Sequence, residues 1–309
     1  MDHRDGTVKG RQMNKWITAG TAAALTGAAT LARSEYERVH LDVVHYQIET
    51  TKLSKAWNGF KAVFLSDLHD NQFGQDNEEL LLAIEREQPD IVLIGGDMLV
   101  VKEWAKPDFT ALTKLYQKLV QNYPVYYAFG NHEQRMKEER QTYPGWWESY
   151  RDVLKNSGMH MLINKSATIQ KGNETMRISG ITIPRECYRK GRIPAPSVGY
   201  LEQKIGKASK TDYELLLAHT PTFAKTYADW GADLVLSGHF HGGTIRIPGL
   251  GGVMTPQLQF FSPLARGRVV EGNTQIIVSG GLGTHSINVR LNNLPQLVVV
   301  QFTGWAPIR

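Results

Sequence analysis

Five short strings of polar residues each follow directly on an apolar run, and this pattern constrains the fold more than any other feature of the sequence. The strings are Ser66-Asp67-Leu68-His69, Gly95-Gly96-Asp97, Gly130-Asn131-His132-Glu133, Ala218-His219 and Ser237-Gly238-His239-Phe240-His241. Asp, Asn and His are poor strand residues and are costly to bury without partners. Because the carboxyl ends of strands in an open α/β sheet form a ligand crevice, the pattern predicts a polar site at the ends of several buried strands.

Apolar runs alternate with amphipathic segments through the first half of the chain. The runs predict buried strands at residues 60–66, 91–95 and 125–129, and the amphipathic segments predict helices at 76–88, 107–122 and 146–157, with a polar connection after residue 129. Further strands are predicted near 177–183, 214–217, 233–236, 244–247, 275–279 and 296–302. The βαβ alternation favours a parallel sheet, whereas the short strands and Gly/Pro turns of the tail favour an antiparallel one. We therefore expect one α/β domain, a two-sheet β-sandwich flanked by helices, with mixed sheets and an antiparallel C-terminal part.

Composition excludes several other classes of protein. Of the 309 residues, 41% are hydrophobic and 21% are charged, which excludes a disordered or fibrous chain. The single cysteine, Cys187, excludes an internal disulfide framework and any zinc or iron–sulfur site with several cysteine ligands. Because Cys187 lies outside the five strings, we interpret it as a structural residue.

Seven side chains in the strings are nitrogen or oxygen donors that suit divalent metal ions. They come from all five strings. Imidazole and carboxylate ligands without a thiolate suit Mn²⁺, Fe or Zn²⁺. Seven donors are too many for one tetrahedral ion, but they fit two ions about 3.5–4 Å apart that share a carboxylate. An extended backbone would place both side chains of Asp67-x-His69, and both of His239-x-His241, on the same side. Each string alone is compatible with ordinary turn chemistry, so the interpretation depends on their joint occurrence.

In this order, the strings resemble the calcineurin-like metallophosphoesterase family over about residues 60–245. The tail, with GGTIRIPGLGGV at 242–253 and VSGGLGTHSINVRLNNLPQLVVV at 278–300, resembles the bacterial YkuE-like branch of that family. That branch includes membrane-associated enzymes that cleave UDP-2,3-diacylglucosamine, and it typically has an N-terminal anchor or export signal. The resemblance implies the metallophosphoesterase fold and a metal-dependent hydrolase of phosphate esters or diphosphates, with a phosphorylated small molecule or a lipid-linked compound as substrate.

The resemblance also implies a role for each residue of the strings. It implies one metal ion held by Asp67, His69 and His241, a second held by Asn131, His219 and His239, and a bridging ligand in Asp97. His132 matches the family's catalytic histidine, which donates a proton to the leaving oxygen or stabilises its charge. Glu133 is expected either to orient that imidazole or to be a surface residue that opens a helix. In the implied mechanism, two metal ions lower the pKa of a shared water, and the resulting hydroxide attacks phosphorus in line.

Two other functions are compatible with the same fold. One is a binding or scaffold protein that has lost catalysis, but such proteins usually lack His132 or several ligands, and every position is filled here. The other is a nuclease. The nearly neutral charge of the chain after residue 33, and the absence of a basic sequence interleaved with aromatic residues, weigh against a nucleic-acid partner.

The N-terminus resembles a targeting segment. Residues 1–33 carry five basic and two acidic side chains, so they hold three of the five excess positive charges of the chain. Residues 16–32 carry no charge and follow three basic residues, a pattern typical of a signal peptide or signal-anchor. We expect residues 34–309 to form the metallophosphoesterase domain. Positive charge stays on the inner side of a membrane, so the pattern predicts a membrane-anchored or exported protein with its catalytic domain outside the cytoplasm. The alternative is a small-residue helix that packs on a cytoplasmic domain.

Several residues outside the predicted ligand set allow two interpretations. Asp70 is expected to cap the next helix or to restrict anionic substrates, and Arg246 to reach a substrate phosphate or to point outward. His285 lies in a Gly-rich turn that the family resemblance places near the rim of the site. The basic loop at residues 185–192 is a solvated surface or a region that attracts phosphate-rich substrates or lipid headgroups.

An aromatic cluster follows the third polar string. Tyr143, Trp146 and Trp147 are expected to pack in the core beneath the next helix, and the alternative is an apolar lip beside the site.

Overall fold

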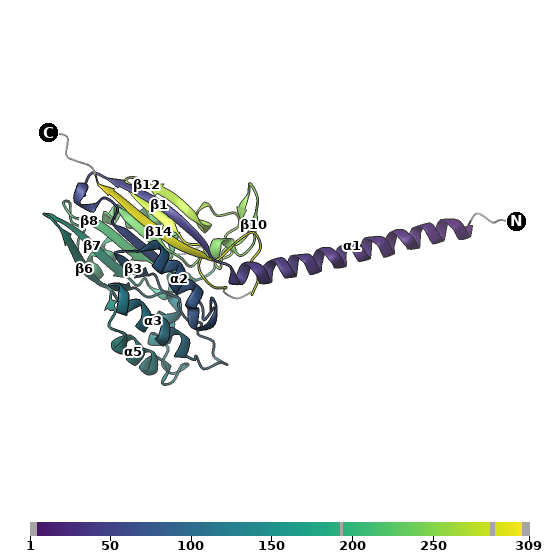
Figure 1. Cartoon of the computed structure of the whole chain (residues 1–309), viewed down its shortest axis with the longest axis horizontal. Coiled ribbons are helices and arrows are strands. Elements are labelled where there is room, and N and C mark those ends of the chain that lie inside the picture. The colour runs from purple at the N-terminus through teal and green to yellow at the C-terminus, as the bar shows by residue number, and fades with distance from the viewer. Residues whose placement is uncertain (1–4, 192–193, 285–287, 305–309) are drawn as a thin grey trace.

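Two six-stranded sheets face each other in the structure, a computed structural model that describes residues 5–191, 194–284 and 288–304 (Figure 1). The first sheet has the strand order β1-β14-β2-β3-β4-β5, formed by β1 (Asp42–Thr50), β14 (Gln296–Gly304), β2 (Lys61–Leu65), β3 (Ile91–Ile94), β4 (Val125–Tyr127) and β5 (His160–Met161). The second has the order β12-β13-β9-β8-β7-β6, formed by β12 (Gly267–Glu271), β13 (Thr274–Val278), β9 (Leu234–Ser237), β8 (Tyr213–Ala218), β7 (Glu174–Ile181) and β6 (Lys165–Lys171). A short hairpin, β10 (Arg246–Ile247) with β11 (Gly251–Gly252), stands apart from both.

Both sheets mix parallel and antiparallel pairs. Strands β2, β3, β4 and β5 run parallel, as do β7, β8, β9 and β13. The pairs β14–β2, β6–β7 and β12–β13 are antiparallel. The predicted two-sheet sandwich with mixed sheets is therefore confirmed. The antiparallel C-terminal part is the β12–β13 hairpin, whereas β14 returns to the first sheet and pairs in parallel with β1.

The central strands are buried on both faces, which is why they are almost continuously apolar in sequence. On β2, Ala62 and Phe64 point into the space between the sheets, where Phe64 belongs to the same buried cluster as Leu215 of the second sheet. Val63 and Leu65 alternate with them and point to the outer face, beneath the helices. The side chains of each central strand thus pack into two buried clusters, one on each face of the sheet. This packing fixes the position of the C-terminal end of the strand.

Helices cover the outer face of each sheet. The first sheet is covered by α2 (Glu78–Glu87), α3 (Thr110–Asn122) and α5 (Trp146–Ser157), and the second by α6 (Val198–Ile205) and α7 (Ala224–Trp230). Tyr143, Trp146 and Trp147 are buried in the core beneath α3 and α5, so the core-packing interpretation of this aromatic cluster is confirmed.

The sequence pattern does not predict helix α4 (Asn131–Glu138) or the strands β1, β5, β6, β11 and β12. A polar connection is expected where α4 lies, and this expectation is wrong. Met136 is the only large apolar residue of α4, so the segment lacks a helical hydrophobic period. The helix is stabilised instead by hydrogen bonds of its buried polar side chains, which are described below.

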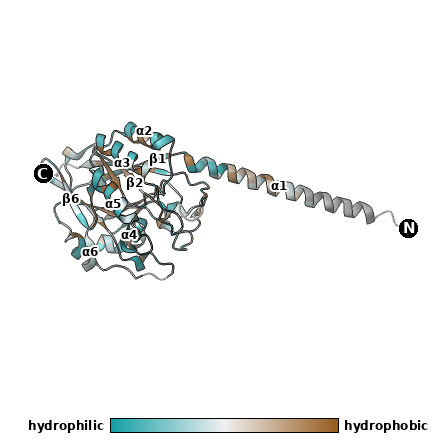
Figure 2. Cartoon of the chain, turned by 90° about the horizontal axis from the view of Figure 1, so that it is seen from below, coloured by the Kyte–Doolittle hydropathy of each residue, from teal (hydrophilic) through white to brown (hydrophobic). Residues whose placement is uncertain are grey.

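Helix α1 (Asp5–Val39) extends away from the body of the molecule (Figures 1 and 2). Among the described residues, no helix combines the length and the apolar character that crossing a membrane requires. The side chains of residues 18–33 are exposed, whereas Ser34 and Glu37 are buried where α1 meets the body. The helix runs without a break through residue 33, and the predicted division of the chain at that point stays a prediction.

Candidate metal centre

The structure brings all of the predicted ligands to the C-terminal ends of β2, β3, β4, β8 and β9. Three groups of buried side chains have donor atoms within 4.8 Å of one another: Asp67 with His69 and His241, His69 with Asp97 and His132, and Asp97 with His219 and His239. The groups share members, so they form one cluster. Residues up to 174 positions apart in the sequence meet because parallel strands end at the same edge of each sheet.

Left-handed turns aim these side chains at the cluster. Five of the predicted ligands have positive φ: Asp67 (54°), His69 (50°), Asp97 (52°), His239 (67°) and His241 (49°). The expectation that Asp67-x-His69 and His239-x-His241 are extended is therefore wrong. Asp67 and His69 belong to one group of donors, whereas His239 and His241 belong to two different groups of the cluster. A left-handed conformation costs an L-residue about 1 kcal/mol or more, and strain of this kind concentrates at functional sites.

One half of the cluster is formed by Asp67, His69 and His241. The Nε2 atoms of the two imidazoles lie 3.1 Å apart. Asp67 Oδ1 lies 3.4 Å from Nε2 of His241 and 3.9 Å from Nε2 of His69. Three donors from two strand ends therefore converge on one point. The Nδ1 atom of His241 lies 3.1 Å from the carbonyl oxygen of Gly283, which fixes the ring with Nε2 facing the cluster.

The other half is formed by Asp97, His219 and His239, and Asn131 lines a cavity together with His239. Asp97 Oδ2 lies 3.1 Å from Nε2 of His219 and 3.9 Å from Nε2 of His69, so this one oxygen lies between the two halves. His219 Nδ1 lies 2.8 Å from the Gly95 carbonyl oxygen, which orients that ring. Asn131 Oδ1 is buried and accepts no hydrogen bond within the described part of the chain, a costly state for an amide oxygen that a metal ion would relieve. The donor set therefore fits a divalent metal.

Burial and neighbouring charges shift the pKa values of several side chains in the cluster. Burial raises the pKa of the Asp67 carboxyl to about 6. Burial acts in the same direction on Asp97, but the imidazoles of His219 and His132 outweigh it and hold the pKa of Asp97 well below its usual value. Burial opposes protonation of His219, yet the carboxylates of Asp97 and Asp67 raise its pKa to about 10. Without metal, these residues therefore share protons that a divalent cation must displace.

His132 belongs to the cluster through His69 and Asp97, and two donors fix the tautomer of its neutral ring. Its Nδ1 accepts the backbone N–H of Val101 at 2.9 Å and lies 3.0 Å from Nη2 of Arg135. Because both partners are donors, the neutral ring carries its proton on Nε2. The backbone N–H of His132 donates to Asp97 Oδ1 at 2.7 Å, which holds the residue beside the shared carboxylate.

Glu133 is fully buried, so the interpretation as a surface residue is wrong, although Glu133 does lie in the first turn of a helix, α4. Oε2 accepts the N–H groups of Asp97 at 2.9 Å and Gly130 at 3.0 Å. Oε1 accepts the N–H of Met98 at 2.9 Å and the Tyr127 hydroxyl at 3.0 Å. The donors that orient His132 are Val101 and Arg135, so Glu133 instead fixes the turn that carries Asp97. Burial raises the pKa of Glu133 to about 7, with a further contribution from Asp97.

Arg290 is a buried residue of the site that the sequence pattern does not identify. Its guanidinium donates to the carbonyl oxygens of Gly280, Gly281, Gly283 and Asn293. The loop at residues 280–283 packs directly against the metal-ligand turn, because a side chain at Gly283 would lie 2.0 Å from the Leu68 carbonyl oxygen. Arg290 thus fixes the carbonyl that orients His241. The Gly-rich sequence indicates a tight turn here, but nothing near Arg290 indicates its role.

A second contact missed from the sequence links α1 to the same ligand. The buried Glu37 carboxylate accepts the backbone N–H groups of Asn292 at 2.9 Å and Asn293 at 2.7 Å. The Asn293 side-chain amide donates to the carbonyl oxygens of His241 at 2.7 Å and Thr244 at 3.1 Å. The end of α1 is therefore tied to the turn that presents His241.

The remaining candidate residues have structural contacts. Asp70 accepts the backbone N–H of Val100 at 2.9 Å and so joins two turns of the site, while α2 begins eight residues later. Arg246 donates to the Gly242 carbonyl oxygen at 3.0 Å and supports the turn after His241. Cys187 is buried, and burial raises the pKa of its thiol to about 11, in agreement with a structural role. His285 lies outside the described residues.

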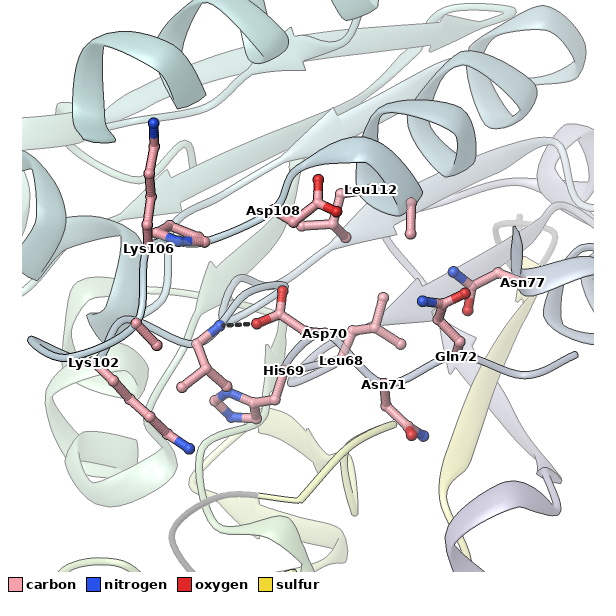
Figure 3. Close-up of a pocket in the computed structure, with 14 residues that line it drawn as sticks. Leu68, His69, Asp70, Asn71, Gln72, Asn77, Lys102, Lys106, Asp108 and Leu112 are labelled. Atoms are coloured by element: carbon pink, nitrogen blue, oxygen red, sulfur yellow. Dashed lines mark hydrogen bonds between the residues drawn. The ribbon is translucent and has the colours of Figure 1, made fainter. Parts of the chain in front are cut away.

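Three cavities open around the cluster. One of about 410 Å³ adjoins His69, and Figure 3 shows Asp70, Lys102, Lys106 and Asp108 around it, with the Asp70–Val100 hydrogen bond as a dashed line. A second, of about 400 Å³, is lined by His132, Arg135, Tyr143 and the exposed Trp104. A third, also of about 400 Å³, is lined by Asn131, His239 and the basic loop at residues 185–190.

The model of the calcineurin-like phosphoesterase family matches residues 60–243, which include every residue of the cluster. The chain belongs to the calcineurin-like phosphoesterase family. The resemblance inferred from the five polar strings is therefore confirmed, and the protein is a metal-dependent phosphoesterase, a hydrolase.

Curated relatives of this phosphoesterase agree with the family. It is 27% identical to phosphodiesterase YaeI of Escherichia coli (strain K12) over 251 residues, which cover 78% of this chain and 82% of the relative. It is 24% identical to the uncharacterized metallophosphoesterase YkuE of Bacillus subtilis (strain 168) over 302 residues, 94% of this chain and 96% of the relative. An uncharacterized metallophosphoesterase of Aquifex aeolicus (strain VF5) is 29% identical over 277 residues, covering 88% and 96%.

Two solved structures show a more remote similarity to this phosphoesterase. Phosphopantetheinyl hydrolase from Mycobacterium tuberculosis superposes with a TM-score of 0.40 and 11% identity over 73% of this chain and 91% of its own. The 5′-nucleotidase precursor from Thermus thermophilus superposes with a TM-score of 0.40 and 16% identity over 72% of this chain and 49% of its own.

Proposed function

We propose that this phosphoesterase cleaves a phosphate ester or a diphosphate with two divalent metal ions. The observation that carries the proposal is the position of Asp97, whose Oδ2 lies 3.1 Å from His219 and 3.9 Å from His69. One carboxylate shared by two groups of ligands is what a two-metal site requires. Phosphodiester cleavage is the favoured activity, because the relative YaeI is named a phosphodiesterase.

The proposed ligand sets follow the two halves of the cluster. One ion is assigned to Asp67, His69 and His241, the other to Asn131, His219 and His239, and both to Asp97. The nitrogen and oxygen donors suit Mn²⁺, Fe or Zn²⁺. When bound, the two ions supply Lewis-acid chemistry, polarising the phosphoryl oxygens and lowering the pKa of a water molecule.

The chain's own residues position the substrate and move the proton. His132 carries its proton on Nε2 and is assigned to donate it to the leaving oxygen. Arg135 and the Val101 N–H hold the other ring nitrogen, so the donor is oriented before substrate binds. The cavity lined by His132, Tyr143 and Trp104 is the proposed place of the leaving group. Its aromatic side chains suit a substrate with an apolar part, a lipid-linked compound included.

The proposal is tested with the purified full chain loaded with Mn²⁺, Fe²⁺ or Zn²⁺ in separate preparations. We expect two ions per chain by elemental analysis and hydrolysis of bis(4-nitrophenyl) phosphate above that of 4-nitrophenyl phosphate. Asp97→Asn is expected to lower both the metal content and the rate. A single ion per chain in every preparation, or an Asp97→Asn enzyme with full activity, contradicts the two-metal assignment. Activity that appears only with DNA or RNA supports a nuclease instead.

We also propose that residues 1–33 direct the protein to a membrane or to export, so that the catalytic body lies outside the cytoplasm. The support is the uncharged segment at residues 16–32 after three basic residues, at the exposed end of α1. Fractionation of cells that express the full chain or residues 34–309 tests it. Equal recovery of both forms in the soluble cytoplasmic fraction contradicts the proposal.

A further inference from the structure

The cavity beside Asn131 and His239 is the most basic of the three around the cluster. Its walls carry four basic side chains, Arg135, Arg185, Arg189 and Lys190, and one acidic side chain, Glu186. The cavity beside His69 has a similar volume but balanced charge, with two lysines and two aspartates. The cavity beside His132 carries two basic side chains and one acidic one, so the largest excess of positive charge lies beside Asn131 and His239.

Two of these basic side chains, Arg189 and Lys190, have neither an ion pair nor a hydrogen bond to a site residue among the described residues. Arg185 forms an ion pair with Glu139, and Arg135 is engaged by Val101 and His132. Arg189 and Lys190 are exposed, and neither forms an ion pair within the part of the chain that the structure describes. Their charges are therefore available to a ligand in the cavity.

The basic loop is fixed against the candidate metal ligands. The Tyr188 ring lies edge-on to His239, with ring centroids 5.1 Å apart. The Cys187 carbonyl oxygen accepts a hydrogen bond at 3.0 Å from the buried Gln257 side chain, which also lines the cavity. These contacts hold Arg189 and Lys190 in the wall of the cavity that Asn131 and His239 also line. A ligand bound by the two basic side chains would therefore lie in the cavity that adjoins the candidate metal centre.

We propose that this cavity binds a second phosphate group of the substrate while the scissile phosphate lies at the metal centre. The inference rests on the proposed function and narrows it to phosphate esters that carry a further phosphate. Arginine matches phosphate through two parallel N–H···O bonds, and lysine adds a point charge. No carboxylate of the described residues pairs with Arg189 or Lys190, so a phosphate group could bind to both side chains without displacing an ion pair.

The test uses two nucleotides that differ only in the second phosphate. The metal-loaded full chain is assayed with thymidine 5′-(4-nitrophenyl phosphate) and with the same compound phosphorylated at the 3′ position. The wild-type enzyme is expected to prefer the 3′-phosphorylated ester at least about tenfold in kcat/KM, chiefly through KM. The Arg189→Gln/Lys190→Gln enzyme is expected to lose that preference and to keep its kcat for bis(4-nitrophenyl) phosphate.

A matched control removes the same charge elsewhere. Lys207→Gln/Lys210→Gln changes two exposed residues outside the three cavities and is expected to keep the preference. An equal loss in both double variants shows general electrostatic steering and overturns the inference, as does a wild-type enzyme without preference.

Binding separates this inference from the proposed function. Thymidine 3′,5′-bisphosphate and thymidine 5′-phosphate are titrated into the metal-loaded chain by calorimetry, which does not depend on catalysis. We expect the wild-type chain to bind the bisphosphate more tightly than the monophosphate, and the Arg189→Gln/Lys190→Gln chain to bind both equally. This result supports a phosphate site in the cavity even if no ester is hydrolysed. Equal affinities overturn it even if bis(4-nitrophenyl) phosphate is cleaved.

Discussion

Oε2 of Glu133 accepts the backbone N–H of Asp97 at 2.9 Å, so a buried carboxylate on α4 fixes the turn that presents Asp97 to the candidate metal centre. The same side chain accepts the N–H groups of Met98 and Gly130 and the Tyr127 hydroxyl. The buried Glu133 carboxylate therefore positions a backbone segment of the site. It affects metal binding indirectly, because it fixes the position of Asp97.

Replacing Glu133 by Gln is expected to weaken both folding and metal binding. The amide nitrogen would face a backbone N–H group in place of an acceptor, which costs about 1–3 kcal/mol. Urea unfolding of the metal-free chain measures the loss, and metal titration measures the fall in affinity. Glu138→Gln, on the exposed side of the same helix, serves as the control and is expected to change neither. Normal metal affinity in Glu133→Gln would show that the turn does not need this carboxylate.

Removing the His132 imidazole is expected to lower kcat about 10²–10⁴-fold, the usual range for a general acid. The loss should be larger for an alkyl leaving group than for 4-nitrophenolate, because a good leaving group needs less protonation. His132→Ala is measured with both kinds of ester, with elemental analysis to verify the metal content. His160→Ala, an exposed histidine stacked on Tyr126, is the control. An equal loss for both esters contradicts the role of proton donor.

Metal affinity is expected to fall as the pH falls, and more steeply below pH 6. His219, with its pKa raised to about 10, is protonated in the metal-free chain throughout the physiological range and must release one proton on binding metal. Asp67, with its pKa raised to about 6, adds a second proton only below that pH. The apparent Kd should therefore rise about tenfold per pH unit above pH 6 and about a hundredfold below it. Calorimetric titration in two buffers with different ionisation enthalpies counts the protons; a constant count between pH 5 and 8 contradicts the assignment.

The buried Arg290 is expected to be one of the most sensitive positions outside the ligand set. Arg290→Met leaves four buried carbonyl oxygens without this donor and is expected to cost at least about 3 kcal/mol in the free energy of unfolding. Arg266→Met breaks a partly exposed ion pair with Asp42 and is expected to cost less than about 1 kcal/mol. Urea unfolding of both variants makes the comparison. Similar losses would show that the Gly-rich loop does not depend on Arg290.

The chain should tolerate removal of residues 1–33 but not of residues 1–39. The shorter deletion keeps Ser34 and Glu37, whereas the longer one leaves the N–H groups of Asn292 and Asn293 without the Glu37 carboxylate. We therefore expect the longer deletion to weaken metal binding through Asn293 and His241. Thermal unfolding and metal titration of the two proteins test this; equal behaviour would show that α1 makes no contribution to the site.

The sequence allows most of the fold and the ligand positions to be predicted for one physical reason. Central strands buried on both faces are continuously apolar, and a polar residue directly after such a strand is conspicuous. Contacts made through backbone groups leave no such pattern. Glu37 reaches Asn293 across 256 positions, and Arg290 binds carbonyl oxygens, which every residue possesses. Helix α4 is missed for a related reason, since its buried polar side chains replace the apolar period that identifies other helices.

The length of α1 sets a distance scale for the whole enzyme. Its 35 residues, at about 1.5 Å per residue, make a rod roughly 50 Å long that is attached to the body at Ser34 and Glu37. A partner that binds the first turn of α1 would therefore lie a full helix length away from the catalytic body. The stiffness of this one helix would then set how far the phosphoesterase reaches and how it is oriented toward a substrate. A Pro or Gly-Gly inserted near the middle of α1 would kink the helix, so that the orientation of the catalytic body would no longer depend on the position of the first turn.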